Sequence, residues 1–445
     1  MSFIVRPAMN LQGEIYLQGD KSIAHRSLIL SGLCRGKTSI ENFPVNKDCL
    51  YTLNALKKLG LKIVLKKDKR KFNTAVVYGK GLNGLKAPRS PVFVGDSGTT
   101  MRLLLGVLAG QDFIARVEAG KYLSLRPMLR VIYPLRLMGS QINARSKLVK
   151  GLLEQYPPVT VKGARLKAIS YKIPVASAQV KSAILLAGLY AIGCTKVVEP
   201  TPTRDHTERM LKLFKVKIKN LGKEISLKGG QELFSPGKVY VPGDISSASF
   251  FMVAALIVPG SRILIKSISL NPSRIGIINV LKRMGADIKI RRSKMPVSGA
   301  EPMGDVIIKT SRLKGVTVKK QEVPTLIDEL PILMVAACFA RGKSVFEGVE
   351  ELRVKETDRI NSMLINLRAM GAEIKAMNSL QGETMVVNGA AVLKGAAVKS
   401  FGDHRTAMSL VVAGLAAEGR TEVDDLSCIN KSFPAFISLL DKLKQ

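Results

Sequence analysis

The sequence predicts an α/β protein assembled from six copies of one structural unit. A glycine turn that recurs along the chain and two kinds of helix that alternate with strands carry this prediction. In each copy an apolar, small-residue helix ends near a glycine and runs into a strand. The six turn glycines lie 67 to 83 residues apart, at Gly36, Gly110, Gly193, Gly260, Gly342 and Gly419. This long, regular period indicates repeated subdomains rather than an ordinary solenoid.

The two helices of each copy have different patterns. The first is rich in Ala, Gly and Leu on nearly all sides, as in AGLYAIG (187–193) and AALIVPG (254–260), so it should be buried against a sheet. The second has leucines three and four residues apart with lysines between them, as in LNALKKLGLKI (53–63), and should face water on one side. Each copy therefore reads strand, helix, strand, helix, then strands.

Two glycine-rich stretches imitate nucleotide-binding motifs. GLCRGKT (32–38) resembles a phosphate-binding loop, but it is one residue short between its glycines, and its lysine follows a helix instead of opening one. GKGLNG (79–84) matches GxGxxG, yet Pro88 and Pro91 come soon after it and disfavour the helix that a dinucleotide site needs. We expect neither stretch to bind a nucleotide.

Charge narrows the class of partner. Lys and Arg total 69 against 34 Asp and Glu, a formal net charge of +35, which suits nucleic acid, an acidic membrane or small molecules with phosphate and carboxylate groups. The absence of Trp, the 5% aromatic content and the position of KKDKRK (66–71) and KIRRSK (289–294) in expected hairpins argue against nucleic acid. No apolar run reaches the roughly 18 residues of a membrane span. Small anionic substrates remain the best match.

The cysteines and the N-terminus indicate the compartment. Five cysteines are odd in number, widely spread and never in a CxxC pair, which argues against a disulfide framework and against a zinc site. The first ten residues lack the apolar core of a signal peptide. We therefore expect the protein in a reducing cytoplasm.

Polar motifs mark the starts of the predicted helices. GDKSIAHR (19–26) puts two cations near a helix N-terminus, which is already partly positive, so the arrangement is unfavourable unless an anion binds there. Other such motifs are GDSGTTMR (95–102), SAQVKS (177–182), RDHTER (204–209), IDELPIL (327–333), RVKETDR (353–359) and GDHRTAM (402–408). Each alone could be a helix cap or a solvated charged face.

The histidines favour a functional interpretation of these motifs. The chain has only His25, His206 and His404, and each lies within three residues of an arginine inside one of the motifs. Titratable groups gather at functional sites, so the set is interpreted as converging anion sites.

Taken together and in this order, the motifs, with RPMLR (126–130) and KSFP (431–434), resemble those of the 5-enolpyruvylshikimate-3-phosphate synthases. They run from residue 19 to residue 434, essentially the full chain. The resemblance implies a two-domain inside-out α/β barrel with six βαβαββ repeats, three per domain, and a cleft between the domains. Residues 1–19 plus 243–445 would form a discontinuous domain (repeats 4–6), joined by two crossovers to an inserted domain of residues 20–242 (repeats 1–3).

The resemblance also implies the reaction. The family transfers the enolpyruvyl (1-carboxyvinyl) group of phosphoenolpyruvate to the 5-hydroxyl of shikimate 3-phosphate and releases phosphate by addition and elimination, the sixth step of the shikimate pathway to chorismate. Two anionic substrates require cations, and the proton transfers require an acid and a base. The resemblance implies no metal, no cofactor and a cytoplasmic monomer without nucleic-acid or membrane partners.

Site residues follow from motif position. Those expected to hold shikimate 3-phosphate are Lys21, Ser22, Arg26, Ser177, Gln179, Arg204, Asp328 and Lys355. Those expected to hold phosphoenolpyruvate are Lys21, Gly98, Arg126, Gln179, Arg359, Arg405 and Lys431. The catalytic set is Lys21, Asp328, Glu356 and His404.

Within the catalytic set, the resemblance favours Glu356 as proton donor to the methylene carbon and Asp328 as base at the 5-hydroxyl. Lys21 would share in proton transfer, and His404 would support the phosphoenolpyruvate end. These acid and base roles are interchangeable at this stage.

The sequence departs from the family pattern at two positions. Ala24 stands where serine or asparagine is common, and Asp96 stands where asparagine is usual. A carboxylate beside the phosphoenolpyruvate site should repel that ligand unless it is paired or turned away. Inhibition by glyphosate-type analogues is left open, because Gly98 is typical of sensitive members whereas Arg204 with RPMLR resembles a branch with many tolerant ones.

The nearest alternative is the sister enzyme that enolpyruvylates UDP-N-acetylglucosamine. It usually has a Lys-Asn pair where this chain has Lys21 and Ser22, and a cysteine on a mobile loop. No cysteine stands beside the motifs of the second copy, so the motifs favour the shikimate enzyme.

Overall fold

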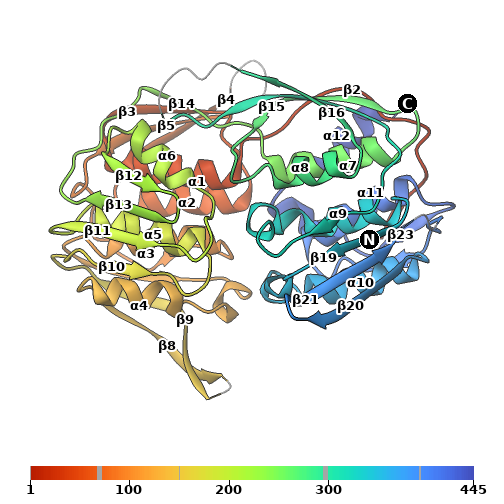
Figure 1. Ribbon diagram of the computed structural model, residues 1–445. Coiled ribbons are helices and arrows are strands. Elements are labelled where there is room, and N and C mark those ends of the chain that lie inside the picture. The colour runs from red at the N-terminus through yellow and green to blue at the C-terminus, as the bar shows by residue number, and fades with distance from the viewer. Residues whose placement is uncertain (1, 68–72, 150, 294–298, 390–391, 445) are drawn as a thin grey trace. The chain divides into compact units, whose positions relative to one another are not determined.

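The computed structural model describes residues 2–67, 73–149, 151–293, 299–389 and 392–444, which form an α/β protein (Figure 1). The chain divides into two compact units. Unit 1 consists of Met1–Leu17, Pro242–Lys294 and Pro302–Gln445, and unit 2 of Gln18–Val241 and Met295–Glu301. Residues 299–301 group with unit 2, although Pro302 and the chain after it group with unit 1. The boundaries after residue 19 and before residue 243 stay predictions.

Unit 2 contains three four-stranded sheets with one strand order. In each, a short strand pairs in parallel with the strand that follows a buried helix, and a hairpin completes the sheet in antiparallel fashion. The sheets are β14 (Lys238–Tyr240), β3 (Arg35–Glu41), β5 (Asn73–Lys80), β4 (Lys62–Lys67); β6 (Val92–Phe93), β7 (Ile114–Glu118), β9 (Leu152–Lys162), β8 (Gln141–Val149); and β10 (Ser170–Lys172), β11 (Cys194–Val198), β13 (Glu224–Lys228), β12 (Ile218–Leu221). The β8–β9 hairpin projects beyond its neighbours (Figure 1).

Unit 1 repeats this order in two four-stranded sheets and varies it in a third. In the third, the N-terminal strand β1 replaces the hairpin. The sheets are β2 (Gln12–Tyr16), β15 (Arg262–Ser269), β17 (Met303–Lys309), β16 (Asp287–Arg292); β18 (Thr317–Val318), β19 (Lys343–Phe346), β21 (Gly382–Asn388), β20 (Glu373–Ser379); and β22 (Ala397–Val398), β23 (Thr421–Val423), β1 (Phe3–Val5). Among the described strands, no sheet closes into a barrel.

Helices alternate with these strands. Unit 2 has α1 (Lys21–Leu33), α2 (Lys47–Lys58), α3 (Gly98–Leu108), η1 (Leu123–Leu125), α4 (Leu129–Leu137), α5 (Ala178–Gly188) and α6 (His206–Leu213). Unit 1 has α7 (Ile245–Ile257), α8 (Gly276–Arg283), η2 (Val323–Thr325), η3 (Ile327–Glu329), α9 (Leu330–Cys338), η4 (Glu350–Val354), α10 (Arg359–Ala369), α11 (His404–Leu415), η5 (Ser427–Lys431) and α12 (Phe436–Leu443). No helix in the described ranges is long and apolar enough to cross a bilayer.

The predicted difference between the two kinds of helix is confirmed. Every residue of α9 is buried, whereas α2 buries only one face, which includes Leu53 and Leu56. Each unit has its own hydrophobic core, formed around α1, α3 and α5 in unit 2 and around α7, α9 and α11 in unit 1. Burial of a single Leu or Ile side chain stabilises the fold by about 1.5–3 kcal/mol, so these helices are held firmly in the core. Only their ends are accessible for contact with a ligand.

The turn glycines serve two different purposes. Five of the six have φ between +65° and +103°, a left-handed conformation that favours glycine. Gly110 is the exception: a Cβ there would lie 2.3 Å from Cγ of Tyr190, so glycine is required by packing. Lys37 and Thr38 of the GKT stretch lie within β3, in agreement with the expectation that they do not open a helix.

Candidate functional site

Several of the predicted site residues lie in the first turns of helices that are otherwise buried. In α1 only Lys21 and Ser22 are not buried, in α5 only Ala178 and Gln179, and in α11 only Arg405. The buried remainder of each helix is core, so the accessible first turn is the part that can meet a ligand. Partly positive helix N-termini are suited to anions.

Side-chain caps fix where these helices begin. Four oxygens accept backbone N–H bonds: Asp20 from Ile23 at 3.0 Å, Ser97 from Thr100 at 3.2 Å, Ser177 from Val180 at 3.4 Å and Asp403 from Thr406 at 3.2 Å. Ser177, predicted to hold substrate, is therefore also a structural cap. Such a cap stabilises a helix by roughly 0.5–2 kcal/mol.

Gln179 joins the first turns of α3 and α5. Its Oε1 accepts from Nη1 of Arg102 at 2.7 Å, and its Nε2 donates to Oγ1 of Thr99 at 2.9 Å. Both the oxygen and the nitrogen of this side-chain amide are thus oriented. The two bonds bring together the motifs at 95–102 and 177–182, which are far apart in the sequence.

Arg102 is a candidate site residue that the sequence prediction missed. A Cβ on Gly98 would lie 2.6 Å from Nη1 of Arg102 and 3.5 Å from Nη1 of Arg126, so glycine lets both guanidinium groups approach the start of α3. The spacing in the sequence could have identified Arg102, because it lies four residues after Gly98 and therefore on the same face of a helix.

Arg26 is held in the interior by neutral groups. It is 4% exposed, and it donates from Nε to Oγ1 of Thr207 at 2.6 Å, from Nη2 to Oγ of Ser182 at 2.7 Å and from Nη1 to the carbonyl of Ser22 at 2.9 Å. Burial, above all, lowers the pKa of Arg26 to about 10, so it remains charged at neutral pH. These bonds tie α1 to α5 and α6.

Lys21 is the accessible cation at the start of α1. Its Nζ lies 2.9 Å from Oδ2 of Asp48, and the two side chains are 30% and 22% exposed. Its orientation is therefore set by a carboxylate on α2.

His25 has a structural role, in contrast to the interpretation of all three histidines as marks of ligand sites. It is fully buried, and its Nδ1 lies 2.6 Å from Oγ1 of Thr52, which in turn lies 2.6 Å from Oγ1 of Thr100. Burial lowers the pKa of His25 to about 3, so the ring is neutral and links α1, α2 and α3.

Asp96 is paired with backbone. Its Oδ1 accepts the N–H groups of Tyr122 and Leu123 at 2.9 and 3.0 Å, at the start of η1. A Cβ on Gly120 would lie 2.6 Å from the same oxygen. The carboxylate thus fastens the segment that ends at Arg126, the residue that follows η1.

In unit 1, carboxylates surround Arg359. The side chain is 1% exposed; Nε donates to Oδ2 of Asp403 at 2.9 Å, Nη2 donates to Oε2 of Glu356 at 2.7 Å, and Nη1 lies 3.5 Å from Oδ1 of Asp328. Burial lowers the pKa of Arg359, but the carboxylates outweigh burial and raise it. Arg359 thereby orients two of the predicted catalytic carboxylates.

The remaining predicted residues of unit 1 lie around this group. Nη1 of Arg405 donates to the carbonyl of Asp328 at 2.9 Å. His404 begins α11, and burial lowers its pKa to about 4, so it is neutral at pH 7. Burial also lowers the pKa of Lys355. Lys431 is the last residue of η5, and its side chain lies outside the described part of the structure.

The predicted residues thus form two sets, one in each unit. Unit 2 holds Lys21, Ser22, Arg26, Gly98, Arg126, Ser177, Gln179 and Arg204, and unit 1 holds Asp328, Lys355, Glu356, Arg359, His404, Arg405 and Lys431. Arg204 immediately precedes Asp205, the residue before α6. Among the described residues, no group of three or more His, Cys, Asp and Glu could hold a metal ion.

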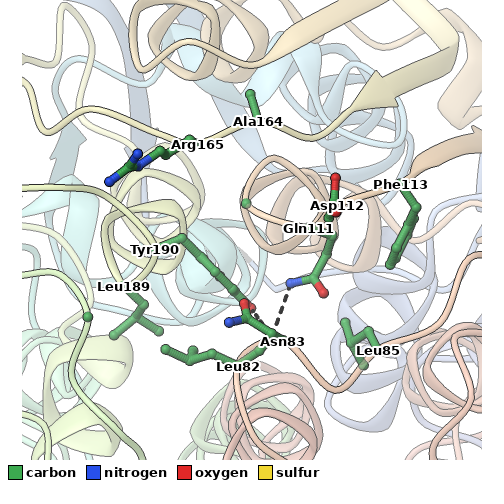
Figure 2. Close-up of a pocket in the computed structure, with 12 residues that line it drawn as sticks. Leu82, Asn83, Leu85, Gln111, Asp112, Phe113, Ala164, Arg165, Leu189 and Tyr190 are labelled. Carbon is green, nitrogen blue, oxygen red and sulfur yellow. Dashed lines mark hydrogen bonds between the residues drawn. The ribbon is translucent and has the colours of Figure 1, made fainter.

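A cavity of about 500 Å³ in unit 2 lies apart from these helix starts (Figure 2). It is lined by residues that follow the C-terminal ends of α3 and α5, including Gln111, Asp112 and Tyr190. Inside it, Gln111 Nε2 and the Tyr190 hydroxyl both donate to the carbonyl of Leu82, at 3.2 and 3.1 Å. None of the predicted site residues lines this cavity.

Comparisons with known proteins agree with the motif order. Residues 5–440 match the family model of EPSP synthase (3-phosphoshikimate 1-carboxyvinyltransferase). A 3-phosphoshikimate 1-carboxyvinyltransferase of Geobacter sp. (strain M21) is 45% identical over 444 residues, which cover 100% of this chain and 99% of the relative. One of Bacillus subtilis (strain 168) is 45% identical and covers 98% of each chain.

Solved structures agree as well. An EPSP synthase from Acinetobacter baumannii superposes with a TM-score of 0.86 at 41% identity and covers 100% of this chain and 98% of that one. The enolpyruvyl transferase NikO from Streptomyces tendae, with a TM-score of 0.74 at 16% identity, shares the fold. On these findings, this chain belongs to the EPSP synthase (3-phosphoshikimate 1-carboxyvinyltransferase) family.

Proposed function

We propose that this chain transfers the 1-carboxyvinyl group of phosphoenolpyruvate to the 5-hydroxyl of shikimate 3-phosphate and releases phosphate. The observation that carries the proposal is the exposure pattern of α1, α5 and α11: of their five accessible positions, all except Ala178 are positions that the family's motifs assign to substrate, namely Lys21, Ser22, Gln179 and Arg405.

Unit 2 supplies most of the cations for shikimate 3-phosphate in this proposal, and Lys355 of unit 1 supplies another. In the bonds described above Arg26 donates to hydroxyl and carbonyl groups and Arg102 to an amide, so both guanidinium groups are oriented by neutral acceptors. The planar guanidinium suits phosphate and carboxylate groups, which are the anionic groups of the proposed substrates. Lys21, Ser22, Ser177, Gln179 and Arg204 complete the set on unit 2.

Unit 1 supplies the proton chemistry. Glu356, 41% exposed and oriented by Arg359, is assigned the protonation of the methylene carbon, and Asp328, 20% exposed, the removal of the 5-hydroxyl proton. Lys21 shares in proton transfer and the neutral His404 supports the phosphoenolpyruvate end, together with Arg126, Arg359, Arg405 and Lys431. These acid and base roles stay interchangeable until variants are tested.

The finer architecture is part of the proposal. The six sheets with their helices are assigned to six βαβαββ repeats, three per domain, arranged as an inside-out α/β barrel with a substrate cleft between the domains. A cytoplasmic monomer is proposed on the family resemblance, and the compartment also on the odd number and wide spread of the cysteines.

Phosphate release by the purified protein tests the function. We expect phosphate only when phosphoenolpyruvate and shikimate 3-phosphate are both present, and none with either alone. UDP-N-acetylglucosamine in place of shikimate 3-phosphate should give no release. Release with UDP-N-acetylglucosamine, or none with the two proposed substrates, would refute the assignment.

A further inference from the structure

The start of α6 is unlike the starts of the other site helices. Asp205 precedes it, but no side-chain cap is formed; the carboxylate of Asp205 instead accepts from Nε of Arg209 at 2.8 Å. Other contacts must therefore fix the position of this first turn, and Arg204 lies immediately before it.

Three consecutive buried side chains provide those contacts. His206, Thr207 and Glu208 are 0%, 1% and 2% exposed. Each contacts a different part of unit 2: Nδ1 of His206 lies 2.7 Å from Oε1 of Glu301, Oγ1 of Thr207 accepts from Nε of Arg26 at 2.6 Å, and Oε1 of Glu208 lies 2.7 Å from Nζ of Lys181. The first turn of α6 thus connects Glu301 to Arg26 and borders Arg204.

Glu301 reaches α6 from a distant part of the chain, the connection between β16 and β17. Gly299, with φ of +85°, lies directly on the helix backbone: a Cβ there would be 2.6 Å from the amide nitrogen of Leu213 and 2.7 Å from the carbonyl oxygen of Arg209. Only glycine permits this approach. The Glu301 side chain is 3% exposed, and its Oε1 lies within hydrogen-bond distance of Nδ1 of His206.

Pro302, the residue after Glu301, is bound within the other unit. It belongs to unit 1, where its carbonyl accepts the N–H of Leu270 at 2.8 Å. The chain therefore passes from unit 2 to unit 1 directly beside the His206–Glu301 pair.

We propose that His206 and Glu301 are positioning residues for the acceptor-phosphate side of the site. The pair holds the uncapped first turn of α6 so that Arg204 and the Thr207–Arg26 bond keep their places, and it joins this turn to the chain that continues into β17. This inference rests on the proposed function, which assigns Arg26 and Arg204 to shikimate 3-phosphate. The two residues act through the arginines and do not touch substrate.

Equilibrium binding of shikimate 3-phosphate to Glu301→Ala, Glu301→Gln and wild type tests the pair. Glu301→Ala should weaken binding by roughly tenfold, the scale of one buried hydrogen bond, whereas Glu301→Gln keeps an acceptor oxygen and should stay within about threefold of wild type. The KM for phosphoenolpyruvate at saturating shikimate 3-phosphate should change by less than about twofold in both, again because the effect is confined to one hydrogen bond. The matched control is Glu224→Ala, which removes a half-exposed ion pair of 2.7 Å with Lys196 in the same unit.

Hydrogen exchange of the wild type supplies a readout that requires no variant. Shikimate 3-phosphate should slow amide exchange both in His206–Leu213 and at residues 299–301. Protection of neither segment, or Glu301→Ala binding as tightly as wild type, would overturn the positioning role. Wild-type protein that does not bind shikimate 3-phosphate would refute the proposed function instead, so the two failures are distinguishable.

Discussion

The site arginines Arg26 and Arg102 of unit 2 have different kinds of hydrogen-bond partner from Arg359 of unit 1. In unit 2, Arg26 donates to hydroxyl and carbonyl oxygens and Arg102 to an amide oxygen. In unit 1, Arg359 is surrounded by the carboxylates of Asp403, Glu356 and Asp328. A cation held by neutral groups retains its charge for an anionic ligand, whereas a cation among carboxylates orients those carboxylates. The contrast suggests that unit 2 is organised to bind the anionic acceptor substrate and unit 1 to transfer protons.

The largest expected effect is on turnover. Glu356→Gln removes a titratable carboxyl but keeps an oxygen that can accept from Arg359, so kcat should fall by about two to four decades, the scale of a lost general acid or base. Binding of shikimate 3-phosphate should stay nearly intact. Steady-state phosphate release and equilibrium binding measure the two quantities.

Glu350→Gln is the matched control for this variant, because Glu350 is 51% exposed and lies 3.5 Å from Lys320, a residue with no predicted role in the site. It should retain near wild-type kcat. A Glu356→Gln enzyme with unchanged kcat would remove Glu356 from the mechanism and erase the contrast between the units.

The next effect concerns pH, because each unit buries one neutral histidine. Burial lowers the pKa of His25 to about 3 and that of His404 to about 4, against an ordinary value near 6.5. The unfolded chain therefore takes up these protons at higher pH than the folded chain. The stability gained from keeping each ring neutral is complete above about pH 6.5 and is lost as the pH falls from there to the folded-state pKa, on the order of 5 kcal/mol for His25 and 3 kcal/mol for His404.

Urea unfolding between pH 4 and pH 7 checks this pH dependence. The free energy of unfolding of His25→Asn should fall less steeply with decreasing pH than that of wild type. Equal slopes would contradict the neutral, structural assignment of His25.

A smaller effect is expected at Arg126, whose guanidinium lies near the start of α3. Arg126→Ala should raise the KM for phosphoenolpyruvate by about ten- to a hundredfold, the scale of a hydrogen bond to a charged group. Arg116→Ala, at a 53% exposed arginine paired with Glu118, should leave the KM unchanged. An Arg126→Ala enzyme with the wild-type KM would contradict the use of motif position to assign the cations of unit 2 to substrate binding.

The smallest expected effect is at Asp96, where two variants distinguish the role of the negative charge from that of the acceptor oxygen. Asp96→Asn keeps an oxygen for the N–H groups of Tyr122 and Leu123 and should leave the KM for phosphoenolpyruvate within about twofold. Asp96→Ala removes the acceptor and should raise that KM by about three- to tenfold, because the loop that carries Arg126 loses a cap. Equal KM values for the two variants would mean that the acceptor oxygen has no positioning role.

The sequence predicts what depends on local periodicity. Burial of α9 and the one-sided burial of α2 follow from the spacing of apolar residues, and the first-turn positions of Lys21 and Arg405 follow from the motifs. It does not predict pairings between distant segments. The contact between His206 and Glu301 joins residues 95 positions apart, and no local pattern marks either as a partner of the other.

Asp96 and Arg102 show two further limits. The partners of Asp96 are backbone N–H groups, which every residue except proline has, so no sequence pattern distinguishes them. Arg102 lies within α3 and is followed there by apolar residues, and its role emerges only when α5 brings Gln179 beside it. The sequence predicted that Asp96 would repel the ligand unless it is paired or turned away, and the structure pairs its carboxylate with two backbone N–H groups.

The measurement that tests the division between the units most directly is binding of shikimate 3-phosphate without phosphoenolpyruvate to Arg204→Ala and Arg405→Ala. Arg204 is in unit 2 and Arg405 in unit 1. Arg204→Ala should weaken binding by at least about tenfold and Arg405→Ala by less than about twofold, since a lost charged hydrogen bond acts where the phosphate is held. A larger loss of binding in Arg405→Ala than in Arg204→Ala would contradict the assignment of shikimate 3-phosphate binding to unit 2.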